Sequence, residues 1–344
     1  VFDSSRGYTI DLADSGSLRV LPSLGDSVGD IIQVLGARIA RTNPLNLEVE
    51  LGMGVDLGVV SVDKFGFRLP VDPLGPPTIT ALGVGINIPE VLEGKGYLEI
   101  KEDGFAGQLD LTLPSVGMRI AGALAVRTAT EGDRSATAVL VTLAAELPTG
   151  IPLGGTGLAI FGFLGLFAMH HARLENLSAR NPALDWLVNV VHGDPTDLRG
   201  WGPKLDAWAF GLGLVAGTIE GGTVLNLKGM LVLELPGPRV LLFVKANILS
   251  ERPDTKGTDT GALFAVVDVN PQRVLIGIQF EYEIEAVLDL KVPIEAGFFY
   301  DPPLFPPEHF YVDAGTIAQP ITAKVLQLFD ATAYFMVHGD GIPD

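Results

Sequence analysis

A Gly-Asp-Ser-Val-Gly stretch at residues 25–29 has the Gly-x-Ser-x-Gly pattern in which some hydrolases place a nucleophilic serine. It lies between a short strand-like segment and an apolar pattern of helical period, the setting that such a nucleophile requires. Ser27 with Asp30 also forms a capping box, which starts a helix without any catalytic role. A serine hydrolase further needs alternating strands and helices, whereas this chain places strand after strand. We therefore expect Ser27 to be a helix cap, and catalysis at Ser27 is the weakest hypothesis.

A repeated His-Gly-Asp tripeptide contains the candidate metal ligands. His192 and Asp194 form one copy, and His338 and Asp340 form the other. Each copy could supply one imidazole and one carboxylate to a shared ion. The same tripeptide also ends an element in an ordinary turn, where the glycine takes a positive φ. We expect turns here, and no cofactor.

Three acidic residues at alternate positions, Glu281, Glu283 and Glu285, would lie about 7 Å apart on one strand face. Glycoside hydrolysis needs two carboxylates that face each other across a sugar, and a single row does not provide this. The row could bind calcium, but a solvated acidic face is the simpler interpretation.

The alternation around these acids predicts a long β structure. From Val274 to Phe298 every even position is apolar, and the odd positions are largely polar. Only a strand with one buried face has a period of two. The segment is either one very long bent strand or two strands whose connection preserves the phase. The even positions near the acids form a candidate face for the core or for an apolar ligand: Ile276, Ile278, Phe280, Tyr282 and Ile284.

Residues 147–169 carry no charged side chain, so this segment is long enough to cross a bilayer. It contains six glycines, which disfavour a helix. Its dense apolar part, Leu158–Met169, is too short to span a membrane. We predict a strand buried on both faces or a glycine-bent hairpin, and no transmembrane segment. Its aromatic residues join the candidate core or ligand face: Phe161, Phe163 and Phe167.

Similar alternation elsewhere predicts a mainly β fold with one or more large, mostly antiparallel, curved amphipathic sheets, like a sandwich or a groove. Two short accessory helices are expected, at 27–41 and at 182–191, where Asn181 is the cap and Pro182 the first helical residue. We place a domain division between 1–171 and 172–344. A single continuous domain and a fragment of a larger protein are alternatives.

The composition excludes several partners. The 344 residues carry a formal net charge of −18 and include no cysteine. Such a chain repels phosphate backbones and anionic lipid surfaces, so nucleic-acid binding is not expected. The first residues show neither the basic start nor the apolar core of a signal peptide, which slightly favours a cytoplasmic location and otherwise leaves the compartment undetermined.

Several stretches are similar to a known family. They read GIPLGGTGLAIFGFLGLFAMHHARLE, NPALDWLVNVVHGD, GWGPKLDAWAFGLGL and LELPGPRVLLF, with LEGKGYLEIKEDGFAGQLDLTL before them and ATAYFMVHGD after them. Over residues 90–340 the chain resembles a family of very large, glycine-rich bacterial and fungal β proteins catalogued only as a domain of unknown function. The chain departs from the family where Leu164-Gly165-Leu166 and His170-His171 replace a second glycine pair and an arginine. The resemblance implies a β fold and no established activity.

Three functional hypotheses follow. The first is a non-catalytic scaffold or interaction module that binds a protein partner or self-assembles. The second is a carrier of lipid or another apolar ligand in a β-sheet groove. The third is the serine hydrolase using Ser27. We expect a protein that is not an enzyme.

Overall fold

The chain is mainly β: strands make up 73% of a computed structural model, and the described strand pairs are antiparallel. The predicted fold class is confirmed. The chain divides into two compact units, Val1–Arg127 and Thr128–Asp344. The division expected near residue 171 falls inside the second unit. The structure describes residues 2–3, 7–10, 32–40, 45–56, 60–72, 78–101, 104–248, 262–300 and 307–339.

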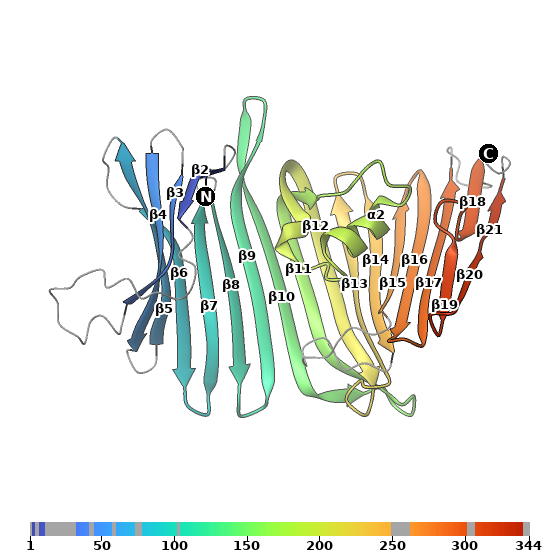
Figure 1. The fold of residues 1–344 in the computed structure, drawn as a ribbon, viewed down its shortest axis with the longest axis horizontal. Helices are drawn as coiled ribbons and strands as arrows, with labels where there is room; N and C mark the ends of the chain where they lie inside the picture. The colour runs from blue at the N-terminus through green and yellow to red at the C-terminus, as the bar shows by residue number, and fades with distance from the viewer. Residues whose placement is uncertain are drawn as a thin grey trace. The chain divides into compact units, whose positions relative to one another are not determined.

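The first unit is an antiparallel sheet in which strands that are successive in the chain are neighbours (Figure 1). One face carries apolar residues, and the other carries cross-strand ion pairs. Arg68 Nη2 lies 2.9 Å from Glu48 Oε1, and Arg119 Nη2 lies 2.7 Å from Asp110 Oδ2. The strands are β1 (Phe2–Asp3), β2 (Gly7–Ile10), β3 (Ile32–Ala40), β4 (Leu45–Asp56), β5 (Val60–Asp72), β6 (Thr78–Ile88), β7 (Leu92–Lys101), β8 (Gly104–Leu113) and β9 (Met118–Glu131), which continues past the division.

Strand β3 covers most of the segment for which the sequence predicts a helix over 27–41, and that prediction is wrong over residues 32–40. A bulge at Leu35 inserts one residue into the pairing of β3 with β4. Ile32 before the bulge and Ile39 after it both lie opposite apolar residues of β4, so the alternation shifts by one position. One residue inserted into a period of two separates apolar residues by three or four positions, which is also the spacing along one face of a helix.

The second unit is also an antiparallel sheet. From β10 to β17 each strand pairs with the strand that follows it (Figure 1). At the far end β17 pairs with both β18 and β19, which pair in turn with β21 and β20. The strands are β10 (Arg134–Pro152), β11 (Leu158–Arg173), β12 (Trp201–Thr218), β13 (Leu225–Leu235), β14 (Arg239–Ile248), β15 (Ala262–Asn270), β16 (Arg273–Ile284), β17 (Leu288–Phe299), β18 (His309–Ala314), β19 (Ile321–Val325), β20 (Phe329–Ala333) and β21 (Phe335–His338).

The uncharged segment forms the hairpin of β10 and β11. Its turn contains Gly154 and Gly157 at positive φ, 60° and 74°. The extended conformation predicted for Leu158–Met169 is confirmed. Of the two predicted arrangements, the glycine-bent hairpin is the one that forms. Burial on both faces is wrong, because Phe163 is 50% exposed whereas Phe161 is 1% exposed. No helix in the described ranges is long and apolar enough to span a membrane.

The alternating stretch Val274–Phe298 forms two strands, β16 and β17. They are joined by a tight turn at residues 285–287, where the Val287 N–H donates to the Ile284 carbonyl (2.9 Å). Even positions lie opposite even positions along the whole pair. Of the two arrangements compatible with the sequence, the pair of strands with a preserved phase is therefore the one that forms.

Residues 174–200, which we call the excursion, leave the sheet after β11 and return at the start of β12. Arg173 lies opposite Trp201 in the register, so both ends of the excursion are adjacent. The Asn181 side chain accepts a hydrogen bond from the Leu184 N–H (3.1 Å) and caps the first helical turn. The helix and cap predicted over 182–191 are confirmed. The excursion contains α2 (Pro182–Asp185), a π-helical turn η1 (Trp186–Val190) and a 3-10 turn η2 (Leu198–Gly200).

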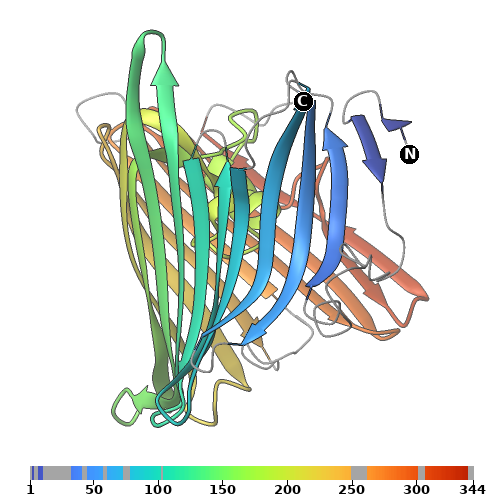
Figure 2. The ribbon, with the colours of Figure 1, turned by 90° about the vertical axis from the view of Figure 1, so that its left-hand side faces the viewer.

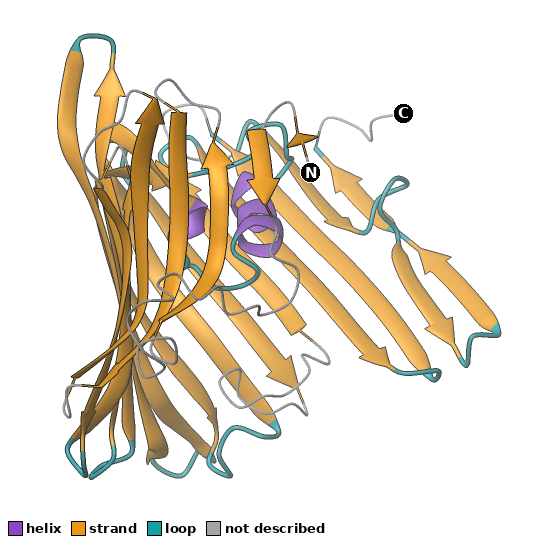
Figure 3. Cartoon of the chain, turned by 60° about the vertical axis from the view of Figure 1, so that its left-hand side comes forward, coloured by secondary structure: helices purple, strands orange, loops and turns teal. Residues whose placement is uncertain are grey.

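The excursion covers one face of the second sheet (Figures 2 and 3). Fully buried side chains of the excursion and of the sheet form the core of this unit. Trp186 is fully buried, packs edge-on against Trp201 and donates from Nε1 to the Gly200 carbonyl (2.8 Å). It also contacts Phe243 of β14. A Cβ on Gly277 of β16 would come within 3.0 Å of side-chain atoms of the excursion. The absence of a side chain there lets the helix approach the sheet.

Candidate functional site

The face of the second sheet opposite the excursion, which we call the apolar face, presents three apolar rows across β10 to β18. Cross-strand register fixes each row, and every described member is apolar. The first row is Val141, Phe167, Phe210, Leu233, Val240, Val269, Val274, Phe298 and Phe310. The second row is Leu143, Gly165, Leu212, Leu231, Leu242, Val267, Ile276, Ala296 and Val312. The third row is Ala145, Phe163, Leu214, Gly229, Val244, Ala265, Ile278, Ile294 and Ala314.

The apolar face is exposed where it crosses β11 to β14. Leu212 is 78% exposed, and its neighbour Leu231 is 51% exposed. On the covered face of the same strands, Val232 is 0% and Leu166 is 5% exposed. The core residues therefore lie beneath the excursion, and the apolar face carries a second set of large apolar side chains in contact with solvent.

The structure places the sequence-predicted apolar residues on this face with one exception. A bulge between β11 and β12 makes Phe161 the extra residue, and its ring lies with Ala159 next to Gly150 on the covered side. The others lie on the apolar-face side of β16 and β11: Ile276, Ile278, Phe280, Tyr282, Ile284, Phe163 and Phe167.

The predicted acidic row lies on the opposite face of β16. Glu281 Oε1 lies 2.6 Å from Lys291 Nζ on β17, and this hydrogen bond holds the pKa of Glu281 below its usual value. Glu283 is exposed and lies opposite Asp289, and Glu285 lies in the turn. Glu281 is therefore paired with a lysine, whereas Glu283 faces another carboxylate.

The predicted metal ligands are also placed in different surroundings. Asp194 Oδ2 lies 3.1 Å from Lys228 Nζ, and His338 Nε2 lies 2.9 Å from Asp313 Oδ1. His192 is exposed, at a positive φ of 49°. Among the residues that the structure describes, no three histidine, aspartate or glutamate side chains form a group that could hold a metal ion. Ser27 and Asp340 lie outside the described residues.

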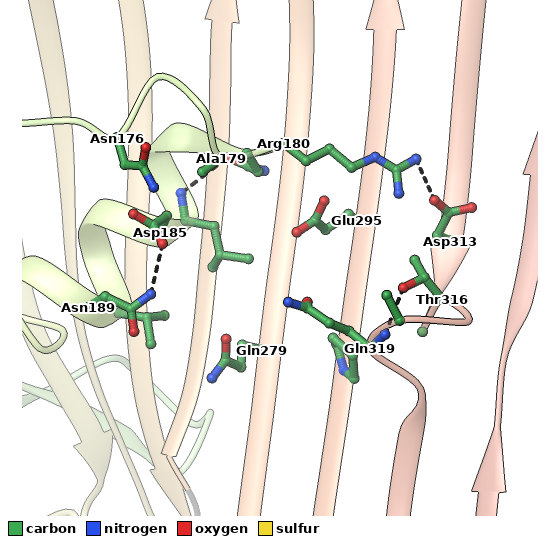
Figure 4. Close-up of a pocket in the computed structure, with 16 residues that line it drawn as sticks. Asn176, Ala179, Arg180, Asp185, Asn189, Gln279, Glu295, Asp313, Thr316 and Gln319 are labelled. Atoms are coloured by element: carbon green, nitrogen blue, oxygen red, sulfur yellow. Dashed lines mark hydrogen bonds and ion pairs between the residues drawn. The ribbon is translucent and has the colours of Figure 1, made fainter. Parts of the chain in front are cut away.

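A cavity of about 440 Å³ lies between the excursion and strands β16 to β18 (Figure 4). Asp185 and Asn189 line it from the helical segment. Gln279 and Glu295 line it from the sheet, and Gln319 from the loop after β18. Asn189 and Gln319 are exposed, so the cavity opens to solvent. Its polar lining is composed mainly of amides and carboxylates.

An ion pair between the excursion and β18 lies at one end of the cavity. Arg180 Nη2 of the excursion lies 2.5 Å from Asp313 Oδ2 of β18, and the guanidinium stacks on the Tyr311 ring at 3.7 Å. Asp313 is 1% exposed and contacts His338 on its other oxygen. Burial raises the pKa of Glu295, and Asp313 adds to this effect while Arg180 opposes it. Oε2 of the Glu295 carboxylate is buried without a hydrogen-bond partner.

A second charged network fixes the start of the excursion. Arg173 donates to Glu175 (2.7 Å) and to Glu234 (2.6 Å), and its guanidinium lies over the Trp186 ring. Burial alone would lower the pKa of Arg239, but hydrogen bonds to Asp268 and Glu175 raise it on balance. The acids and bases of this network satisfy one another, which indicates a structural role.

Sequence reasoning missed the cavity, although it found the Asn181 cap at its edge. The lining residues come from residues 176–189, from β16 and β17, and from residues 313–319. No local motif connects these segments. The polar residues Gln279 and Glu295, at odd positions within strongly apolar strands, were the available signal.

Comparisons with known proteins identify no relative. No family model matches the chain, no curated protein matches it, and no solved structure matches it. The resemblance drawn from the sequence stays a prediction.

Proposed function

We propose that this chain is a non-catalytic assembly module, which packs the apolar face of its second unit against the same face of a second copy. The three rows carry the proposal, because a sheet surface made only of apolar side chains is what a β-sandwich buries between two sheets about 10 Å apart. Contiguous exposed apolar surfaces of this size mark interaction sites.

The size of the apolar face fits a stable interface. Strands lie about 4.8 Å apart, and alternate residues about 6.8 Å apart, so three rows across β10 to β18 cover roughly 900 Å². A standard interface buries about 800 Å² on each partner. A second copy therefore offers enough apolar area without any further surface.

The charge distribution favours an identical partner. The net charge is −18, but in the second unit the described charged groups of β13 to β17, such as Lys245, Glu281 and Lys291, lie on the covered side of the sheet. Two copies can thus approach through their apolar faces without placing like charges in contact. An isologous contact requires a surface that is complementary to itself, and an uncharged face fulfils this condition.

The same rows favour one alternative, a carrier of lipid or another apolar ligand. Aliphatic chains need no hydrogen-bonding partner, and the rows offer none. A carrier would keep its ligand during purification and would remain a monomer. The experiment that measures assembly therefore also separates these two functions.

The experiment measures the mass of the purified chain by sedimentation equilibrium and the lipid content of its organic extract by mass spectrometry. We expect a dimer without stoichiometric lipid. Leu212→Asp should shift the chain to the monomer, because it places a charge at the centre of the interface, while its 78% exposure leaves the fold intact.

The matched control is Leu177→Asp, at a residue of the excursion that is 83% exposed and lies outside the apolar face. This variant should remain dimeric. A monomeric wild-type chain, or a dimer that Leu212→Asp leaves unchanged, would refute the proposal. A monomer with bound lipid would establish the carrier instead.

A further inference from the structure

The cavity between the excursion and the sheet contains buried polar atoms without partners. Asn181 is 2% exposed, and its Nδ2 has no hydrogen-bond partner, although its Oδ1 caps the helix. Oε2 of Glu295 is also buried without a partner. Both residues line the cavity. Leaving a buried polar group unpaired is unfavourable, so a ligand that draws both atoms into hydrogen bonds would be favoured.

The two unpaired atoms need hydrogen-bond partners of opposite kinds. Asn181 Nδ2 is a donor and needs an acceptor, whereas the Glu295 carboxylate accepts and needs a donor. An ammonium group only donates, and a phosphate or carboxylate group only accepts. A hydroxyl group both donates and accepts. A ligand that carries several hydroxyls can therefore satisfy both atoms.

The remaining lining extends this match. Asn176, Asn189, Gln279 and Gln319 present amides, each of which has a donor and an acceptor side. Asp185 adds a carboxylate on the helical side of the cavity (Figure 4). Vicinal hydroxyls can bridge such planar groups. Uncharged hydroxyls also avoid the repulsion that an anionic ligand would meet from the carboxylates.

The dimensions and the charge of the cavity restrict the ligand further. A volume of about 440 Å³ lies within the range of small-molecule sites. The positive charge of Arg180 is already paired with Asp313 at 2.5 Å, so it is not available to an acidic sugar. We propose that this cavity binds a neutral carbohydrate of one or two sugar units through its amides and carboxylates.

The test is saturation-transfer NMR on the full chain, followed by calorimetric titration. The probes are glucose, galactose, mannose, N-acetylglucosamine, maltose and cellobiose, with glucuronate as an anionic probe and spermidine as a cationic probe. We expect transfer to at least one neutral sugar and to neither charged probe.

Two variants locate the site. Gln319→Ala should weaken binding of that sugar about five- to tenfold, as expected for one lost hydrogen bond, and Glu295→Gln should weaken it by a similar factor. The matched control Gln272→Ala, at an exposed turn residue outside the cavity, should bind as the wild type does. Binding of a charged probe alone, transfer to no neutral sugar, or equal binding by Gln319→Ala and Gln272→Ala would each overturn the proposal.

Discussion

The surroundings of Glu295 disfavour the charged form of its carboxyl group. Glu295 lies on β17 opposite Asp313, in a wall of the cavity. Burial raises its pKa, the nearby Asp313 carboxylate raises it further, and Arg180 compensates only in part. The folded chain therefore holds a proton on Glu295 more tightly than the unfolded chain does.

This difference predicts a pH-dependent effect of Glu295→Gln. Because the folded pKa is raised, the contribution of Glu295 to stability is fully present below its unfolded pKa and is lost as the pH rises through the folded pKa. Glutamine does not titrate. The free energy of unfolding of the variant, minus that of the wild type, should therefore increase as the pH rises from about 4 to about 7. Urea melts at both values measure this, and a difference that does not change with pH would contradict it.

Single residues of the site could be predicted only where their role is local. The cap formed by Asn181 was predicted, because it depends on the next three residues. The pairing of Arg180 with Asp313 was not, because these residues meet only where the excursion crosses to β18. Long-range contacts of this kind leave no periodic trace in the sequence.

At the scale of elements, the alternation of apolar and polar residues predicted the strands. It also predicted which residues of β16 and β17 share a face, since the turn keeps even positions opposite even positions. The same reasoning failed where a bulge interrupts the alternation. The bulge at Leu35 made β3 resemble a helix, and the bulge at Phe161 moved that ring to the covered face. A pattern of period two predicts a strand reliably only while its register is regular.

The β16–β17 pair also predicts opposite effects for two neighbouring acids. Glu283 lies opposite Asp289, so Glu283→Lys replaces a repulsion by an attraction. The free energy of unfolding should rise by about 0.2–1 kcal/mol. Glu281 already pairs with Lys291 at 2.6 Å, so Glu281→Lys should lower the free energy of unfolding by a similar amount. Urea melts of both variants test the register, and changes of the same sign would contradict it.

At the scale of the whole molecule, charge and apolar area act against each other. The net charge of −18 opposes the approach of two copies, whereas the apolar face favours it. Repulsion between distant charges is screened by salt, and burial of apolar surface is not weakened by it. The balance between the two effects must therefore depend on ionic strength.

Dimerisation should accordingly strengthen as sodium chloride rises from about 0.02 M to about 0.5 M, over which the Debye length falls severalfold. Sedimentation equilibrium at a series of salt concentrations gives the dissociation constant. A contact held by ion pairs would weaken over the same range. A dissociation constant that rises with salt would therefore exclude assembly through the apolar face.

The neighbour-to-neighbour pairing of β10 to β17 has a consequence for how such a chain can change over generations. Each strand from β11 to β16 bonds within the described sheet to the strands before and after it in the chain. Loss or duplication of two successive strands leaves the flanking strands antiparallel and in the same phase. The width of the sheet can thus vary by whole hairpins while both faces keep their character. Descendants of one ancestor would then differ in length by two-strand steps, and an alignment that allows only short gaps would fail to connect them.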